Sequence, residues 1–392
     1  MLSSLYIHIP YCIQKCDYCD FFSRPCTGTI PDSYVRSLIN EAEHYGTTRG
    51  ITCWKTIYIG GGTPSLLKAE QISALFQGLS SRIGKDTQEV TMEMNPESVT
   101  PEKLKAAEEG GTTRLSLGIQ SFNEKALKAI NRHCTPEKAI QALDIIKEHW
   151  TGQLNLDAIA GLPEQNMEQF MDSLERIVSY NPDHISLYTL TVEEDTPLFE
   201  KIDKGTIKHD PDTADEQWLK GRDYLESKGY HQYEVSNFAK EGRHSRHNMT
   251  YWKSQDYVGI GSGASGTLYC DENIRWTNTQ DVEKYMGFWE SKAGGCCSAY
   301  DIPCHIESLD KDTREFEFLM MGLRTLDGIN SLEYEKKFDK SLAERLGVDE
   351  GPWHEYSEKK MTLTQKQPDG STRYALNGQG ILFLNNFLLS LM

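Results

Sequence analysis

The sequence predicts an α/β fold: an incomplete (β/α)6 barrel of the TIM type, followed by a smaller C-terminal α+β domain that resembles a winged helix. Between residues 5 and 188, six short β-branched or aromatic runs alternate with helical patterns, which indicates right-handed crossovers and a parallel sheet. Six units rather than eight predict a barrel that stays open on one side. After residue 310, a helical stretch precedes a hairpin pattern and a last helix, which predicts the second domain.

The strands and helices of the barrel follow from these periods. The predicted strands are Leu5–Ile9, Lys55–Ile59, Glu89–Met94, Arg114–Ile119, Leu154–Ile159 and His184–Tyr188. The predicted helices are Asp32–Tyr45, Lys68–Ile83, Pro101–Glu109, Asn123–Ala129, Pro136–Glu148 and Met167–Ser179. A threonine followed by proline, at Thr100 and again at Thr135, is a helix start signal. Beyond the sixth strand we expect a helix at Thr213–Lys228 and an alternating strand at Tyr230–Phe238.

The chain of 392 residues is long enough for two domains. We expect residues 1–240 to form the partial barrel, residues 241–305 to complete its core, and residues 306–392 to form the C-terminal domain. In the last part, Glu315–Arg324 carries an apolar stripe, and Met361–Leu363 and Tyr374–Leu376 predict a hairpin. Because this part is acidic to mixed in charge, we expect a protein-interaction or lid role rather than DNA binding.

Composition limits the classes of function. Lys and Arg number 41 and Asp and Glu 58, a balance of −17, which argues against a nucleic-acid partner. Many of the ten cysteines are isolated, which indicates a reducing compartment. We find no signal-peptide pattern and no apolar run long enough for a transmembrane segment, so we expect a cytoplasmic protein, with a peripheral membrane contact left open. Cys296, Cys297 and Cys304 form a second group, which we interpret as small apolar filler, with a metal or redox role left open.

Three cysteines close to the N-terminus organise the chain. Cys12, Cys16 and Cys19 stand at C-x3-C-x2-C spacing, just after the first predicted strand. Three thiolates on one short loop suit an iron–sulfur cubane that keeps one iron open, and an open iron can chelate the amine and carboxylate of S-adenosylmethionine. Zinc is an alternative, with His8 or Cys26 as the fourth ligand. A chance group of buried thiols is the second alternative.

Polar residues follow the predicted strands at their C-terminal ends. Gly60–Ser65 follows the second strand, Glu93 and Asn95 lie at the end of the third, Gly118–Ser121 ends the fourth, and Asp157 lies near the end of the fifth. A single carboxylate at such a place is usually an ordinary cap or ion pair. The carboxyl ends of parallel strands meet at one edge, however, so we expect one shared ligand site.

These motifs resemble a known family. The cysteine spacing is similar to the signature of the radical S-adenosylmethionine (radical SAM) superfamily. More narrowly, the chain resembles the coproporphyrinogen oxidase-like branch of that superfamily at five motifs: GGGTPS, EMNPE, LSLGIQSF, INRHC and LDAIAGLP. The resemblance implies a radical SAM barrel with a 4Fe-4S cluster on the three cysteines. It also implies an S-adenosylmethionine site formed by Tyr6, Tyr18, Gly61, Gly62, Thr63, Glu93, Gln120, Arg132, Asp157 and, less closely matched, Thr189. In that resemblance Glu93, Gln120 and Asp157 bind the amino group or ribose hydroxyls, and Arg132 pairs with the carboxylate.

A second motif lies at residues 247–252. A histidine beside tyrosine and tryptophan is by default a packed histidine. Here HNxxYW followed by GIGSGA resembles a signature of the heme chaperone (HemW) family, and EFEFLMMGLRTLDGI and LNGQGILFLNN extend that resemblance. It implies heme bound at His247, since neutral imidazole is a standard ligand of heme iron, with the aromatic pair over a porphyrin face. His244 is a rival ligand that the sequence leaves open.

Two functions from different classes are consistent with these motifs. The first is a heme-binding chaperone that carries heme to an acceptor protein, which the sequence does not identify. The second is oxygen-independent coproporphyrinogen III oxidase, which decarboxylates propionate side chains in porphyrin biosynthesis. The oxidase carries a fourth cysteine where this chain has Phe21, it has a longer segment before the first strand, and it lacks the HNxxYW motif, so all three features favour the chaperone. A zinc-stabilised (β/α) enzyme remains a third alternative if iron is absent.

Overall fold

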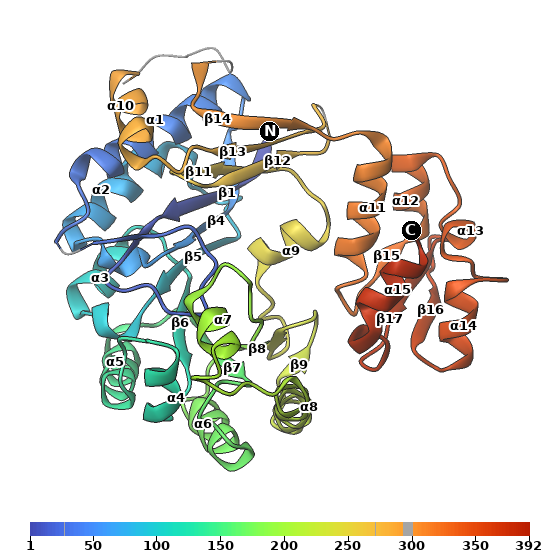
Figure 1. The fold of residues 1–392 in the computed structure, drawn as a ribbon. Helices are drawn as coiled ribbons and strands as arrows, with labels where there is room; N and C mark the ends of the chain where they lie inside the picture. The colour runs from blue at the N-terminus through green and yellow to red at the C-terminus, as the bar shows by residue number, and fades with distance from the viewer. Residues whose placement is uncertain (27, 271, 293–300) are drawn as a thin grey trace.

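The computed structural model describes residues 1–26, 28–270, 272–292 and 301–392 (Figure 1). Its main sheet has 12 strands, and its two end strands are different, so the described part of the sheet is open rather than closed into a barrel. The strand order is β14-β13-β12-β11-β1-β4-β5-β6-β7-β8-β10-β9.

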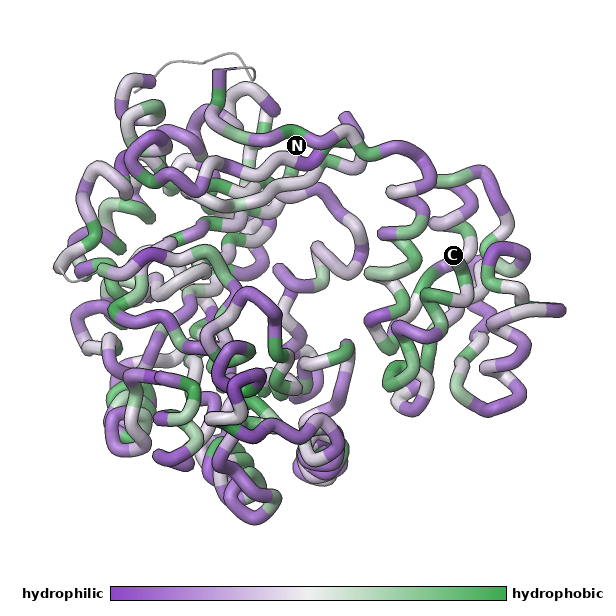
Figure 2. Tube along the Cα trace, in the orientation of Figure 1, coloured by the Kyte–Doolittle hydropathy of each residue, from purple (hydrophilic) through white to green (hydrophobic). Residues whose placement is uncertain are grey.

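The six predicted parallel strands form the centre of this sheet. They are β1 (Leu2–Ile9), β4 (Cys53–Gly61), β5 (Glu89–Met94), β6 (Arg114–Gln120), β7 (Gln153–Ala160) and β8 (His184–Thr189), which pair in that order. The predicted helices between them are present as α1 (Asp32–Thr48), α2 (Ala69–Leu79), α3 (Pro101–Glu109), α4 (Glu124–Ala129), α5 (Pro136–His149) and α6 (Met167–Ser179). They cover the outer face of the sheet (Figure 1), and each shows both hydrophobic and hydrophilic residues (Figure 2), as expected for a helix that buries one face.

Each end of the parallel block is extended by antiparallel strands. Beyond β8 lie β10 (Asn237–Ala239) and β9 (His231–Gln232), and beyond β1 lie β11 (Tyr257–Ile260), β12 (Ser265–Leu268), β13 (Ile274–Asn278) and β14 (Cys304–Ser308). Because β11 runs parallel to β1, the first strand of the chain is internal to the sheet. Three further helices are α7 (Pro197–Asp203), α8 (Pro211–Ser227) and α10 (Val282–Ser291). Helix α8 confirms the helix predicted at Thr213–Lys228.

The prediction of one strand over Tyr230–Phe238 is wrong. The segment folds back between β9 and β10, and the turn pairs with the C-terminal part of the chain instead. Glu234 forms a bridge with Thr325, and Val235 N donates a hydrogen bond of 3.1 Å to Arg324 O. A long-range partner therefore overrides the local alternation of the sequence.

The inner face of the six strands is polar. Alternation turns Leu5 and Ile7 outward against the helices and Tyr6 and His8 inward. Strand register aligns further polar residues on this inner face: Ser4, Thr56, Tyr58, Glu93, Arg114, Asn155, Asp157 and Ser186. A short helix, α9 (Arg246–Trp252), lies against it (Figure 1). Its Thr250 hydroxyl is 3.1 Å from the Ser4 hydroxyl, so α9 is part of the core of the barrel.

The C-terminal part has its own hydrophobic core. It contains α11 (Lys311–Gly322), α12 (Ser331–Phe338), α13 (Leu342–Leu346), α14 (Pro352–Glu358), α15 (Leu384–Ser390) and a three-stranded antiparallel sheet in the order β15 (Ile329–Asn330), β17 (Thr372–Leu376), β16 (Thr362–Lys366). The predicted hairpin is thus present as β16–β17. Arg275 on β13 forms an ion pair of 2.7 Å with Glu317 on α11, which joins the two cores. The exact domain limits and the likeness to a winged helix stay predictions.

Within the described ranges, no helix combines the length and apolar character needed to cross a membrane.

Candidate functional site

The cysteine loop is closed at its base by two short strands. Strand β2 (Tyr11–Cys12) follows β1 directly and pairs in parallel with β3 (Arg24–Pro25). Cys26 N donates a hydrogen bond of 2.7 Å to Cys12 O, and Cys19 N donates one of 3.1 Å to Cys16 O, which makes a tight turn. Cys12, Cys16 and Cys19 are all free thiols. The C-x3-C-x2-C motif therefore lies on one compact loop after the C-terminal end of β1.

The thiols do not converge on one ion-sized point. Among the described residues, no three His, Cys, Asp or Glu side chains are close enough to hold a single metal ion. In a four-iron cluster with three protein ligands each thiolate binds a different iron, so such convergence is not required. His8, one of the two alternative zinc ligands beside Cys26, has both ring nitrogens engaged, Nδ1 with Tyr6 Oη at 2.9 Å and Nε2 with Phe22 O at 3.0 Å.

Asp17 anchors the loop to the barrel. Its backbone N donates a hydrogen bond of 3.0 Å to Ile130 O, and its carboxylate accepts one of 3.1 Å from Asn131 Nδ2. The same carboxylate pairs with Lys201 on α7. Because Asp17 lies between Cys16 and Cys19, these contacts fix the position of the cysteines relative to β6 and β8.

The glycine turn after β4 packs directly against the cysteine loop. Gly62 N donates a hydrogen bond of 2.8 Å to Ile9 O. A Cβ atom at this position would lie 2.7 Å from Tyr11 O and 3.0 Å from Cys12 Sγ, so only glycine permits this approach. The neighbouring Thr63 hydroxyl donates to Cys12 Sγ at 3.5 Å. Gly61 has a φ of +111°, the left-handed region that favours glycine.

Arg132 and Asn95 connect the cysteine loop to the strand ends. Arg132 Nη1 donates to Cys16 Sγ at 3.7 Å, and its Nη2 donates to Gly118 O and, at 3.3 Å, to Asn95 Oδ1. Asn95 Nδ2 in turn donates to Thr63 Oγ1 at 3.1 Å. Arg132 Nε is buried without a partner in the described part of the chain. The sequence places Asn95 among the polar residues at the strand ends but predicts no ligand role for it.

Glu93 is a partly buried carboxylate at the end of β5. It accepts a hydrogen bond of 2.6 Å from the hydroxyl of Tyr58. Burial raises the pKa of Glu93 to about 7, and the charge of Asp157 acts in the same direction. Tyr58 was also missed. The signal for it was the alternation of β4, which places Tyr58 on the same inward face as Thr56.

Asp157 and Gln120 lie on neighbouring strands. Asp157 is directly opposite Gly118 in the register of β6 and β7, and it accepts a hydrogen bond of 2.6 Å from Asn155 Nδ2. Burial raises the pKa of Asp157 above its usual range. Gln120 adopts a φ of +67°, and its Oε1 is buried without a partner among the described residues. An unpartnered buried acceptor and a left-handed backbone at one strand end indicate a place for a ligand.

The remaining predicted residues lie around this edge. Tyr6 stacks on Tyr58 with ring centroids 6.3 Å apart. Tyr18 packs against a small apolar cluster that includes Ile130. Thr189 is exposed at the end of β8. The structure thus brings Thr63, Glu93, Gln120, Arg132 and Asp157 to the strand ends beside the cysteine loop, and leaves Thr189 at the rim.

His247 is buried beneath the inner face of the sheet. Its side chain is 0% exposed, Nδ1 lies 2.8 Å from Thr56 Oγ1, and Nε2 lies 2.8 Å from Tyr251 Oη. Burial lowers its pKa to about 3, so the imidazole is neutral. Both ring nitrogens are therefore engaged, and in this conformation His247 has no free nitrogen for iron. His244, in contrast, is exposed, and its ring stacks on Tyr233 at 4.1 Å.

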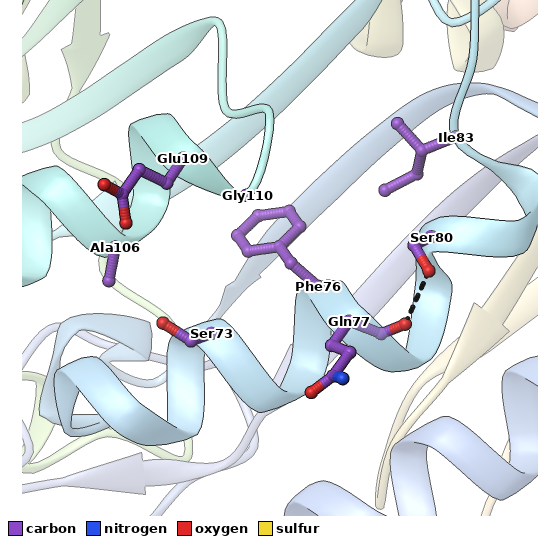
Figure 3. A pocket seen from close by; sticks show the side chains of 8 residues that line it. All are labelled: Ser73, Phe76, Gln77, Ser80, Ile83, Ala106, Glu109 and Gly110. Carbon is purple, nitrogen blue, oxygen red and sulfur yellow. Dashed lines mark hydrogen bonds between the residues drawn. The ribbon is translucent and has the colours of Figure 1, made fainter.

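Two further features lie away from the strand ends. The surface pocket in Figure 3 is formed by α2 and α3 in the outer helix layer, with Phe76, Glu109 and Gly110 among its lining residues, and it contains no predicted site residue. Of the second cysteine group, Cys296 and Cys297 lie outside the described residues. Cys304 is the half-buried first residue of β14.

Comparison with known proteins agrees with the fold and the motifs. The family model of the radical SAM superfamily matches residues 6–177, and the model of the HemN C-terminal domain matches residues 309–351. The solved structure of coproporphyrinogen III oxidase (HemN) from Escherichia coli, described as a radical SAM enzyme, covers 100% of this chain and 89% of its own, with a TM-score of 0.79 and 20% identity. At that identity the likeness shows the fold alone, a radical SAM partial barrel with a C-terminal α+β part.

Curated relatives give the narrower family. The heme chaperone HemW of Escherichia coli is 36% identical over 340 residues, which cover 84% of this chain and 85% of that protein. The heme chaperone HemW of Lactococcus lactis is 33% identical over 347 residues, which cover 88% and 87%. A match over more than four fifths of the chain takes in most of the barrel and the HNxxYW helix. This chain belongs to the heme chaperone HemW family within the radical SAM superfamily.

Proposed function

We propose that this protein binds heme and carries it to an acceptor protein, with a 4Fe-4S cluster and S-adenosylmethionine held in the barrel. The observation that carries the proposal is the identity of about a third with two proteins named heme chaperones, over more than four fifths of the chain. The HNxxYW helix at the centre of the inner face supports it. We also propose a cytoplasmic location, supported by the free thiols of described cysteines such as Cys12, Cys53 and Cys134.

The residues at the strand ends fit the cofactors that the superfamily implies. Cys12, Cys16 and Cys19 supply the three thiolates, and the missing Cβ of Gly62 lets the glycine turn pack against Cys12. The unpartnered Arg132 Nε and Gln120 Oε1 supply a donor and an acceptor. When bound, the cluster supplies an electron to the sulfonium of S-adenosylmethionine.

Different polar side chains would then bind different groups of S-adenosylmethionine. Arg132 already contacts Cys16, so its guanidinium is well placed for a carboxylate held at the cluster. Glu93 and Asp157 would accept hydrogen bonds from the amino group and ribose hydroxyls, together with Gln120. Tyr6, Tyr18, Gly61, Thr63 and Thr189 would complete the site. Tyr58 and Asn95 are added as residues that orient Glu93 and Arg132.

Anaerobic reconstitution with iron and sulfide tests the cluster. We expect about four irons per chain and a visible absorption band in the wild type, and loss of both in Cys12→Ala, Cys16→Ala and Cys19→Ala. Cys53→Ala is the matched control, because Cys53 is a free thiol on β4 whose Sγ lies 3.3 Å from Thr87 Oγ1, away from the cysteine loop. A colourless protein with removable zinc would contradict the proposal.

Heme titration tests the chaperone function. If His247 is the ligand, iron coordination requires α9 to move, because both ring nitrogens are engaged in the present conformation. We expect His247→Ala to weaken heme binding at least tenfold. His244→Ala is measured beside it as the exposed rival, and His231→Ala is the control, since the His231 side chain is exposed and contacts Glu226, away from α9. No heme binding by the wild type would overturn the proposal, and loss of affinity only in His244→Ala would reassign the ligand.

The oxidase is the second candidate, because the fold matches that of HemN. Phe21, at the position of the oxidase's fourth cysteine, argues against it. Incubation of the reconstituted protein with coproporphyrinogen, reductant and S-adenosylmethionine separates the two functions. We expect no protoporphyrinogen, and its formation would support the oxidase.

A further inference from the structure

A chain of four hydrogen bonds connects the start of helix α9 with the carboxylate of Asp157. Ser245 N donates to Tyr233 Oη at 3.2 Å, and Tyr233 Oη lies 2.8 Å from His184 Nε2. His184 Nδ1 lies 2.6 Å from Asn155 Oδ1. Asn155 Nδ2 donates to Asp157 Oδ1 at 2.6 Å. We call this chain of residues the relay.

All the hydrogen bonds of the relay have a fixed donor and acceptor, which the Asp157 carboxylate determines. An ionised carboxylate only accepts, so Asn155 must present Nδ2 to Asp157 and Oδ1 to His184. His184 must then donate from Nδ1, because two acceptors cannot face each other. Burial lowers the pKa of His184 well below its usual range, so the ring is neutral and its Nε2 accepts. Tyr233 is therefore the donor to His184.

The middle of the relay is shielded from water. The side chains of Asn155 and His184 are each 1% exposed, and Tyr233 is 6% exposed. A buried donor or acceptor that loses its partner is not readily satisfied by solvent, so a break at one bond disturbs the next. The relay therefore behaves as one unit.

Each end of the relay lies at a proposed binding site. Asp157 is at the strand ends beside Gly118. Ser245 is the N-cap of α9, which carries the buried His247, and the exposed His244 stacks on Tyr233. Because His247 has no free nitrogen in this conformation, coordination there requires α9 and Ser245 to move. Coordination by His244 would act on Tyr233 directly.

We propose that Tyr233, His184 and Asn155 are positioning residues that hold the Asp157 carboxylate and couple its orientation to the position of α9. The inference rests on the proposed function, in which Asp157 binds S-adenosylmethionine and α9 binds heme. Heme at α9 then weakens S-adenosylmethionine binding at the strand ends, and by linkage S-adenosylmethionine weakens heme binding equally.

The variant Tyr233→Phe removes the relay hydroxyl and keeps the ring that stacks on His244. Tyr230→Phe is the matched control, because Tyr230 is a buried phenol three residues away whose hydroxyl donates to Pro182 O at 2.9 Å, outside the relay. The dissociation constant of S-adenosylmethionine is measured on the reconstituted full chain, with and without heme. We expect Tyr233→Phe to raise it about fivefold, the loss of one buried hydrogen bond, and Tyr230→Phe to leave it unchanged.

The effect of heme on the dissociation constant of S-adenosylmethionine distinguishes coupling from a merely structural role. We expect heme to raise the dissociation constant of S-adenosylmethionine in the wild type and in Tyr230→Phe, and to have no further effect in Tyr233→Phe. Equal behaviour of the two variants with and without heme would overturn the inference and leave the proposed function intact. Failure of the wild type to bind either ligand would overturn the proposed function instead.

A second measurement needs no ligand. Nitrogen-15 NMR of the histidine-labelled protein distinguishes the two neutral tautomers, and the His184 signal is the one missing in His184→Gln. We expect the Nδ1–H tautomer at neutral pH, shifted in Tyr233→Phe and unshifted in Tyr230→Phe. A charged ring or the Nε2–H tautomer would overturn the relay, whatever the protein binds.

Discussion

The hydroxyl of Tyr58 donates a 2.6 Å hydrogen bond to the carboxylate of Glu93. The ring of Tyr58 also lies 5.2 Å from the ring of His247. One side chain thus contacts both the acid proposed to bind S-adenosylmethionine and the histidine proposed to bind heme. This contact and the relay both connect helix α9 with the strand ends. The contact crosses β4 and β5, and the relay crosses β8 and β7.

Tyr58→Phe tests the importance of that hydroxyl. Loss of the hydrogen bond raises the pKa of Glu93 further, so less carboxylate is ionised at neutral pH. We expect the dissociation constant of S-adenosylmethionine to rise about fivefold. Tyr269→Phe is the control, because its hydroxyl donates to Glu317 at 3.1 Å, between the barrel and the C-terminal part. Equal affinities of the two variants, measured by equilibrium dialysis under anaerobic conditions, would contradict the prediction.

Gly62→Ala tests the packing of the glycine turn against the cysteine loop. The added methyl group would contact Tyr11 O at 2.7 Å and Cys12 Sγ at 3.0 Å, so the loop must shift. We expect a loss of about 1–3 kcal/mol in the free energy of unfolding and a lower iron content after reconstitution. Gly84→Ala is the control, since no atom lies within 4 Å of its added Cβ. Normal iron content in Gly62→Ala would show that the turn does not shape the cluster site.

Glu41 predicts a pH dependence of stability. It is buried and accepts hydrogen bonds from Gly261 N at 2.9 Å and Asn278 Nδ2 at 2.7 Å. Burial raises its pKa to about 7, so between the usual carboxyl pKa and pH 7 the folded state binds more protons than the unfolded state. Glu41 therefore contributes up to about 3 kcal/mol to the free energy of unfolding below about pH 4.5. This contribution is lost as the pH rises to about 7.

Thermal unfolding at pH 5 and pH 7.5 checks this prediction. We expect the melting temperature of Glu41→Gln to depend less on pH than that of the wild type over this interval. The exposed Glu109→Gln serves as the control and should follow the wild type. A variant with an unchanged pH dependence would show that Glu41 ionises normally in the folded protein.

Glu89 holds the start of helix α9. Its carboxylate accepts hydrogen bonds from Arg246 N at 2.9 Å and His247 N at 3.0 Å. In Glu89→Gln we expect the amides of α9 to exchange with deuterium about tenfold faster, because the opening free energy falls by about 1–2 kcal/mol. If His247 is the heme ligand, this variant should also bind heme faster. Exchange rates equal to those of Glu109→Gln would contradict the role of Glu89.

The parallel block could be predicted because its signals are local. Runs such as Glu89–Met94 and Pro101–Glu109 have the same bounds in the sequence prediction and in the structure, since periodicity and start signals lie within the segment itself. Strands β11 to β14 gave no such signal. They are only four or five residues long, and β11 is a strand largely because β1 offers it a pairing edge.

The residues of the candidate site also divide into those with a local signal in the sequence and those placed by contacts distant in the chain. The cysteine loop, Glu93 and Asp157 follow from spacing and strand ends. The burial of His247 did not, because a histidine next to Tyr251 and Trp252 has the same sequence whether it is packed or open. The hydrogen bond between His247 and Thr56, 191 positions earlier, distinguishes the two and is made only by the fold.

The internal position of β1 affects how the molecule is made. The ribosome makes β1 long before one of its two neighbours, β11, which comprises residues 257–260. At ordinary elongation rates that neighbour follows on the order of 10 to 50 s later. Throughout this interval the strand that leads into the cysteine loop has a free hydrogen-bonding edge, which is a hazard for aggregation. A nascent chain truncated before residue 257 would keep that edge open permanently.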